Sequence, residues 1–113
     1  GPPLHAHDVE HETWYVASGD FRFRLGDDLH SASTGSFIYV PAGTPHNFQN
    51  IGTHAGRLVV SFSPAGMEGF FEDLATLQPE DIVQQTFAEI GARYGMTVLG
   101  PPLAVSHPLA PDD

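Results

Sequence analysis

Residues 35–50 read Gly-Ser-Phe-Ile-Tyr-Val-Pro-Ala-Gly-Thr-Pro-His-Asn-Phe-Gln-Asn. Two short runs, 37–40 and 46–49, flank a segment with two prolines and a glycine, which predicts two strands joined by a tight turn. Because side chains alternate along a strand, His46 and Phe48 should share one face of the second strand. The stretch therefore places a histidine at the start of a strand, on the same side as an aromatic ring.

A second polar cluster lies upstream, where His5 and His7 are one residue apart and Glu12 follows. An extended chain turns residues two apart to the same face, so the two histidines should point together. Glu12 lies at an odd offset from His7, so a turn or bulge must redirect its side chain toward them. With His46, these residues predict a site for one divalent transition metal (Fe, Mn, Ni, Cu or Zn), because imidazole and carboxylate suit all of these ions. The alternative is that they are ordinary polar residues around a turn.

The two segments resemble the two conserved motifs of the cupin superfamily. The resemblance covers the first 63 residues: His-x-His, Glu12 and Gly19 fit the first motif, and Gly, Pro-x-Gly, His46 and Asn50 fit the second. The connector between them is short, as in bacterial single-domain cupins. The runs Pro-Ala-Gly-Thr-Pro-His-Asn-Phe and Ser-Pro-Ala-Gly-Met-Glu-Gly-Phe-Phe are similar to the quercetin-dioxygenase-like group. The resemblance implies a jelly-roll barrel in which the metal ligands are His5, His7, Glu12 and His46.

The rest of the pattern predicts further strands and then helices. Short apolar or alternating runs between Gly, Pro and Asp turns predict strands at 4–7, 13–16, 21–25, 29–32 and 57–62. Helical spacing appears over residues 67–77. A second helix is expected to open at residues 78–81 and to end before Gly95, with an apolar face of Ile82, Val83, Phe87, Ile90 and Tyr94. A short edge strand at 96–99 and a loose, Pro-rich tail should follow.

These elements predict a single domain. We expect an all-β jelly-roll (cupin) barrel core over residues 1–63, with one or two C-terminal α-helices packed outside it in an appendage and tail, residues 64–113. In the cupin family, strands often precede the first motif and are exchanged between partners, and this sequence has none there. An open sheet edge attracts other strands, so a homodimer is expected.

Several other side chains are candidates for the site. Trp14, Phe23 and Phe48 are expected to bind substrate above the metal; the alternative, favoured for Phe23, is that they are barrel core. Glu12 is the candidate catalytic base. The remaining candidates are expected to have other surroundings: His11 facing away from the site, His30, His54 and His107 in solvent, Arg22 and Arg24 on a solvated face, and Phe70, Phe71 and Phe87 in helix packing.

Composition excludes several classes of partner. The 113 residues carry a formal net charge of −10, with no lysine and four arginines, which argues against nucleic acid and against an anionic membrane surface. The chain has no cysteine, so disulfides and thiolate ligands are excluded. No apolar run reaches the ~20 residues of a membrane span, and no signal peptide is visible, so a cytoplasmic location is expected. The chain begins with Gly rather than Met, which leaves sequence upstream of it open.

Three functions fit the sequence. The first is a metal-dependent dioxygenase acting on a small, partly aromatic organic substrate. The second is an isomerase, cyclase or decarboxylase in which the metal is a Lewis acid. The third is a non-enzymatic cupin that binds a small ligand. Cupins include all three kinds, and a fold alone does not choose among them.

Overall fold

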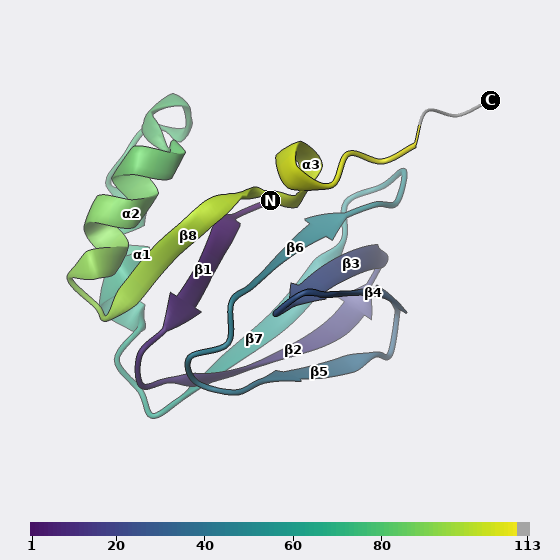
Figure 1. Ribbon diagram of the computed structural model, residues 1–113, viewed down its shortest axis with the longest axis horizontal. Helices are drawn as coiled ribbons and strands as arrows, with labels where there is room; N and C mark the ends of the chain where they lie inside the picture. Colours follow the sequence, from purple (N-terminus) through teal and green to yellow (C-terminus); the bar gives the residue numbers. More distant parts are fainter. Residues whose placement is uncertain (111–113) are drawn as a thin grey trace.

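The computed structural model describes residues 1–110, which form eight strands and a few short helices. The strands are β1 (Pro3–His7), β2 (His11–Ser18), β3 (Asp20–Leu25), β4 (Asp28–Ser33), β5 (Phe37–Val40), β6 (His46–Asn50), β7 (Arg57–Ser63) and β8 (Met96–Pro102). They make a five-stranded antiparallel sheet in the order β4-β3-β6-β1-β8 and a three-stranded one in the order β5-β2-β7 (Figure 1). Every strand expected from the sequence is present.

The main core lies between the two sheets. Along β2 the even-numbered residues from Glu12 to Val16 are buried and the odd ones are not, so Trp14 and Val16 face the other sheet. Phe21 and Phe23 do the same from β3, and together with Val40 these side chains form one buried cluster. Residues 21–25 alternate between apolar and charged because one face of this strand is buried and the other is not.

The predicted all-β fold is confirmed as two facing antiparallel sheets with a few helices. The finer expectation of a closed barrel is not: over residues 1–110 the two sheets share no paired strand. Sheet closure is replaced by side-chain packing between the layers. Within the same range, no helix is long and apolar enough to cross a membrane.

The helices of residues 68–92 lie at the end of the molecule away from the β3–β4 hairpin, and the short last helix lies near the N-terminus, by β6 and β8 (Figure 1). They are α1 (Glu68–Ala75), the 3₁₀ turn η1 (Pro79–Asp81), α2 (Gln84–Ala92) and α3 (Leu103–Ser106). The second predicted helix is thus interrupted, and its first part is a single 3₁₀ turn. Ile82 and Val83 have extended or irregular backbone and are exposed, so their assignment to its apolar face was wrong.

A side chain sets the start of α2. The Thr86 hydroxyl accepts a bond from the Val83 amide (3.0 Å) and donates one to the Asp81 carbonyl (2.7 Å). These bonds satisfy backbone groups that a continuous helix would use, and they place the first helical residue at Gln84. The N-terminal signal at Pro79 is real, but it belongs to the 3₁₀ turn.

The end of the chain is more ordered than the sequence indicates. β8 runs to Pro102, longer than the strand expected at 96–99, and Leu103 in α3 is fully buried. The half-buried Arg22 guanidinium donates to the carbonyls of Leu103 (3.2 Å) and His107. The prediction that Arg22 lies on a solvated face was therefore wrong. The prediction of a loose tail was also wrong for the residues up to 107. The part of this prediction on residues 111–113 lies outside the described residues.

Candidate metal centre

Four side chains from three strands meet between the sheets. His5 and His7 come from β1, Glu12 from the start of β2 and His46 from the start of β6. Each offers one ligand atom, and these atoms lie within 4.8 Å of one another. All four residues are buried, with exposed fractions between 1% and 6%. The structure thus brings together the whole set that the sequence predicts as metal ligands.

Strand pairing explains how distant residues meet. His5 and His46 are direct partners in the antiparallel β1–β6 ladder, which sets their side chains side by side on the inner face. Glu12 arrives from the opposite sheet: the chain bends at residues 8–10 and crosses over before β2 begins. The odd offset between His7 and Glu12 requires a change in the direction of the chain, and the crossing between the sheets provides it. After the crossing, the inner face of β2 points back at β1.

Backbone carbonyls fix the orientation of two imidazole rings. His5 Nδ1 lies 2.7 Å from the Pro3 carbonyl oxygen, and His46 Nδ1 lies 2.7 Å from that of Thr44. A carbonyl only accepts, so each Nδ1 must carry a proton, and Nε2 is the nitrogen of each ring that faces the site. Metal-binding histidines in proteins are commonly held in this way.

His7 provides the clearest test of whether a metal fits. Both of its ring nitrogens are buried, and neither makes a hydrogen bond to any residue of the described range 1–110. Its Nε2 is 3.3 Å from Glu12 Oε2, but without hydrogen-bond geometry. A buried polar atom without a partner is costly, and a cation bound beside Glu12 would give His7 Nε2 a partner. The donor set of three imidazoles and one carboxylate also suits a divalent transition metal.

The two oxygens of Glu12 have different partners. Oε2 lies 2.7 Å from His46 Nε2, whereas Oε1 accepts a bond of 2.8 Å from the indole N–H of Trp14. Burial alone would raise the pKa of Glu12, but hydrogen bonds from His46 and Trp14, together with the nearby His7 ring, outweigh burial and lower the pKa to about 2. Burial, assisted by His46, lowers the pKa of His5 to about 4. At neutral pH the carboxylate is charged and His5 neutral, the forms that bind metal.

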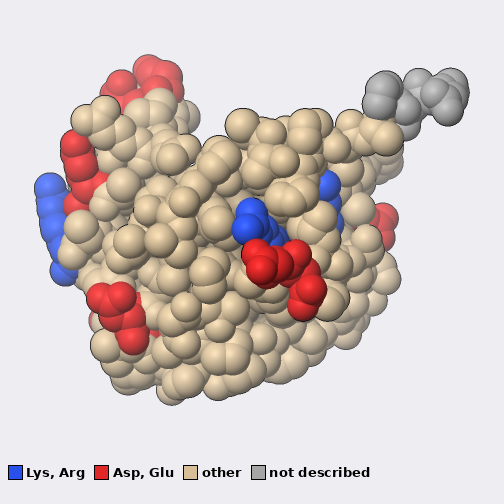
Figure 2. Space-filling model, in the orientation of Figure 1, with Lys and Arg blue, Asp and Glu red and all other residues tan. Residues whose placement is uncertain are grey.

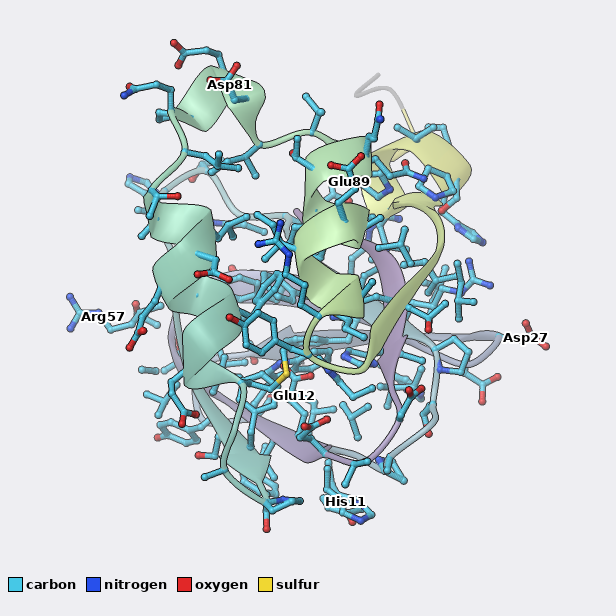
Figure 3. The ribbon with its side chains drawn as sticks, turned by 90° about the vertical axis from the view of Figure 1, so that its left-hand side faces the viewer. His11, Glu12, Asp27, Arg57, Asp81 and Glu89 are labelled. Atoms are coloured by element: carbon cyan, nitrogen blue, oxygen red, sulfur yellow. The ribbon has the colours of Figure 1, made fainter. Side chains whose placement is uncertain are left out.

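An apolar cavity of about 220 Å³ lies against three of the four ligands, His5, His7 and Glu12. Figure 3 shows Glu12 beneath α1 and α2, in the space that these helices cover. Besides His5, His7 and Glu12, the lining is apolar and consists of Pro2, Phe48, Val60, Phe62, Met67, Phe70, Phe71, Leu74, Phe87 and Met96. Among residues 1–110, no other charged or hydrogen-bonding side chain lines it.

The cavity lining differs from the sequence-based expectation. Of the three residues expected to contact substrate, Phe48 lines the cavity, whereas Trp14 and Phe23 are fully buried in the core and do not. Phe70, Phe71 and Phe87, assigned to helix packing, pack together and also line the cavity. The helical spacing of these phenylalanines was visible in the sequence, but nothing in it showed that the helices lie over the metal ligands.

The remaining histidines stay outside the cluster. His11 is exposed, and its Nδ1 lies 2.8 Å from the Tyr39 hydroxyl. His30 and His54 are exposed as well, and His107 is half-buried beside Ser106. His11, His30 and His54 lie where they were expected, whereas His107, expected in solvent, is half-buried; all four lie outside the cluster.

Comparisons with known proteins place the chain in a family. A model of the cupin domain matches residues 1–62. An uncharacterised Streptomyces coelicolor protein is 38% identical over 60 residues, which cover 53% of each chain. Quercetin 2,3-dioxygenase of Bacillus subtilis is 35% identical over 57 residues, 50% of this chain and 17% of that enzyme.

A solved structure agrees with these sequence matches. The crystal structure of the "Putative sugar phosphate isomerase" of Acidithiobacillus ferrooxidans superposes with a TM-score of 0.52 at 26% identity, over 57% of this chain and 42% of that one. The chain spans about half of the length of the Streptomyces protein and a smaller part of the Bacillus enzyme. The cupin-domain match covers more than half of the sequence, and it includes all four clustered residues: the chain belongs to the cupin family.

Proposed function

We propose that this cupin is a mononuclear metal-dependent dioxygenase that acts on a small, apolar and partly aromatic molecule. The observation that carries the proposal is that three of the four ligands, His5, His7 and Glu12, line a cavity whose other walls are apolar. Such a cavity can bury a hydrophobic substrate while leaving one polar group of it next to the metal. The similarity to quercetin 2,3-dioxygenase supports an oxidation of this kind.

The cavity chemistry argues against charged substrates. Phosphate and carboxylate groups are recognised by Arg, Lys or clustered amide donors, and no such side chain lines the cavity. A sugar would also leave its hydroxyl groups without partners against phenylalanine rings. The volume, below the ~300–1,000 Å³ range of drug-sized ligands, suits a molecule of about one aromatic ring with short substituents.

His5, His7, Glu12 and His46 would hold the metal, which when bound supplies coordination positions for substrate and dioxygen. The protein does the rest. The apolar walls exclude water, Phe48 contacts the substrate ring, and Trp14 and Phe23 support Phe48 from the core. Glu12 would also accept the proton of a substrate hydroxyl, for which its carboxylate would have to release the metal in part.

One observation favours a second candidate. Apart from His5, His7 and Glu12, no described side chain that lines the cavity can act as an acid or a base. A cupin that binds a small apolar ligand without turning it over would need none. The sequence also leaves open a Lewis-acid reaction: isomerisation, cyclisation or decarboxylation. These reactions consume no oxygen, so a measurement of oxygen uptake separates them from oxygenation.

The test is oxygen uptake by the metal-loaded protein with a panel of small phenols and hydroxylated aromatic compounds. The proposal expects substrate-dependent uptake that Glu12→Gln lowers at least about 100-fold, within the usual range for a lost base. The control His11→Ala changes an exposed histidine and should keep full activity. Turnover without oxygen uptake would assign a Lewis-acid reaction instead, and tight binding with neither would assign a ligand-binding role.

We also propose a homodimer, formed through the outer face of the β5-β2-β7 sheet. Tyr15 pairs with Phe37 on one side and Val59 on the other, and Tyr39 lies further along β5; all four are exposed. The strand residues on this face include no carboxylate, so two copies of a chain with net charge −10 can approach there with little repulsion. Sedimentation should show a dimer that Phe37→Lys converts to a monomer; a wild-type monomer would contradict the proposal.

The sequence also predicts a small-molecule partner and argues against nucleic acid. On the face shown in Figure 2 the basic side chains are few and separated, so that face offers no continuous basic surface for nucleic acid. A small molecule remains the partner that the cavity supports. The cytoplasmic location and the division of the chain after residue 63 stay predictions.

A further inference from the structure

Trp14 is the donor that holds one oxygen of Glu12. Its indole N–H lies 2.8 Å from Oε1, and both residues are buried, with exposed fractions of 0% and 5%. An indole nitrogen can only donate, so its partner must be an acceptor. Two positions apart on β2, the two side chains share the inner face of the strand.

Packing leaves the indole little freedom to move. Its ring stacks on Phe23 with 4.7 Å between centroids and meets Phe48 edge-on at 5.6 Å. On the neighbouring strands, Ile38 and Val60 are its direct cross-strand partners. The donor therefore has a fixed position, set by the core and not by the ligand cavity, which Trp14 does not line.

We propose that Trp14 is a positioning residue that makes the two oxygens of Glu12 inequivalent. It holds Oε1 away from the histidines, so that Oε2 alone faces His46 and His7. If the carboxylate rotated, the indole N–H would be left buried without an acceptor, which opposes the rotation. Trp14 thus presents Glu12 to a metal through one oxygen, in an orientation set before the metal binds.

A positioning residue and an ordinary core residue should respond differently to mutation. A residue that only fills space changes stability, whichever side chain stands at position 12. A residue that acts through Glu12 changes metal affinity only while Glu12 is present, and a double-mutant cycle measures this dependence. The inference rests on the metal site of the proposed function and not on its reaction.

The experiment measures Zn²⁺ affinity by competition with a chromophoric chelator. The proteins are wild type, Trp14→Phe, Glu12→Ala, the double variant and Phe21→Leu. Phe21 is the matched control, because it is a buried aromatic residue of the same core cluster without a polar atom. Cooperative thermal unfolding of each protein shows that it is folded before titration.

We expect Trp14→Phe to weaken Zn²⁺ binding about 10-fold, at the low end of the effects seen when a partner of a metal ligand is lost. In the Glu12→Ala background the same change should alter affinity less than about two-fold, and Phe21→Leu should stay within about two-fold of wild type. Affinity of Trp14→Phe within two-fold of wild type would overturn the inference. Equal losses in both backgrounds would do so too, because Trp14 would then act through packing alone.

A second variant covers the case in which Trp14→Phe does not fold. Trp14 is the sole tryptophan of the chain, so biosynthetic replacement of tryptophan changes this position alone. An analogue in which sulfur replaces the ring N–H keeps the shape and removes the donor. Zn²⁺ binding weakened about 10-fold supports the inference, and binding equal to wild type overturns it. If the wild-type protein itself does not bind Zn²⁺, both the metal site and this inference fail; if it does, only the inference is at stake.

Discussion

Phe70 and Phe71 are neighbours on α1 but have different surroundings. Phe70 is 2% exposed, whereas Phe71 is 49% exposed. The Phe70 ring lies 5.1 Å from that of Phe87 on α2, and it belongs to a buried cluster with Met67 and Met96 that joins the helices to β8. If the helices cover the cavity as described, replacing these two residues with alanine should have very different effects on stability.

The expected magnitudes follow from burial. Replacing a buried phenylalanine with alanine costs about 3–5 kcal/mol. A chain of this length unfolds with an entropy of about 0.24 kcal/mol/K, so Phe70→Ala should lower Tm by about 12–20 °C. For the half-exposed Phe71 the loss should stay below about 1.5 kcal/mol, or ~6 °C.

Differential scanning calorimetry of the metal-free proteins measures both changes. Keeping the metal out removes any contribution from ligand binding to Tm. Equal shifts for the two variants, or a shift below about 5 °C for Phe70→Ala, would refute the placement of α1. The Phe71 variant serves as the matched control, because it removes the same ring from the next position of the same helix.

Three further predictions concern charged and titratable groups. Arg22→Ala should release the segment that begins at Leu103, seen as faster limited proteolysis there and a stability loss of about 2 kcal/mol; unchanged cleavage would contradict the contact. His5 has a folded-state pKa of about 4 against an ordinary 6.5, so the unfolded chain binds the extra proton first. Stability of the metal-free protein should therefore fall by about 3 kcal/mol as pH drops from 6.5 to 4, and urea unfolding at several pH values would show a flat profile if His5 were not buried. His11→Ala should leave metal content by mass spectrometry unchanged; a loss would add His11 to the site.

Local sequence patterns predicted the sheets well, because the signals are local. Residues 21–25 alternate between apolar and charged, and a strand with one buried face requires that alternation. The spacing from His5 to Glu12 and the turn before His46 placed the four candidate ligands in two segments. The structure brings them to one point because two of them are cross-strand partners and the others lie on the adjoining inner faces.

The features that the sequence could not predict depend on individual side-chain contacts, which hydrophobic periodicity does not register. Arg22 looks like a solvated residue until the chain returns 81 residues later to place the Leu103 carbonyl beside it. The break before α2 depends on a hydroxyl of Thr86 that bonds backward, which helical periodicity does not register. Trp14 is a side chain of the kind that lines ligand cavities, and only its distance to Glu12 shows the role of its N–H.

The central claim is that His5, His7, Glu12 and His46 hold one metal ion, and metal content tests it most directly. Inductively coupled plasma mass spectrometry on the purified, untagged protein should find close to one equivalent of Fe, Mn, Ni, Cu or Zn in the wild type. His46→Ala, which removes a buried ligand, should lose it, while the control His11→Ala should retain it. Absence of metal from the wild type, even after incubation with each of these ions, or equal content in His46→Ala, would contradict the claim.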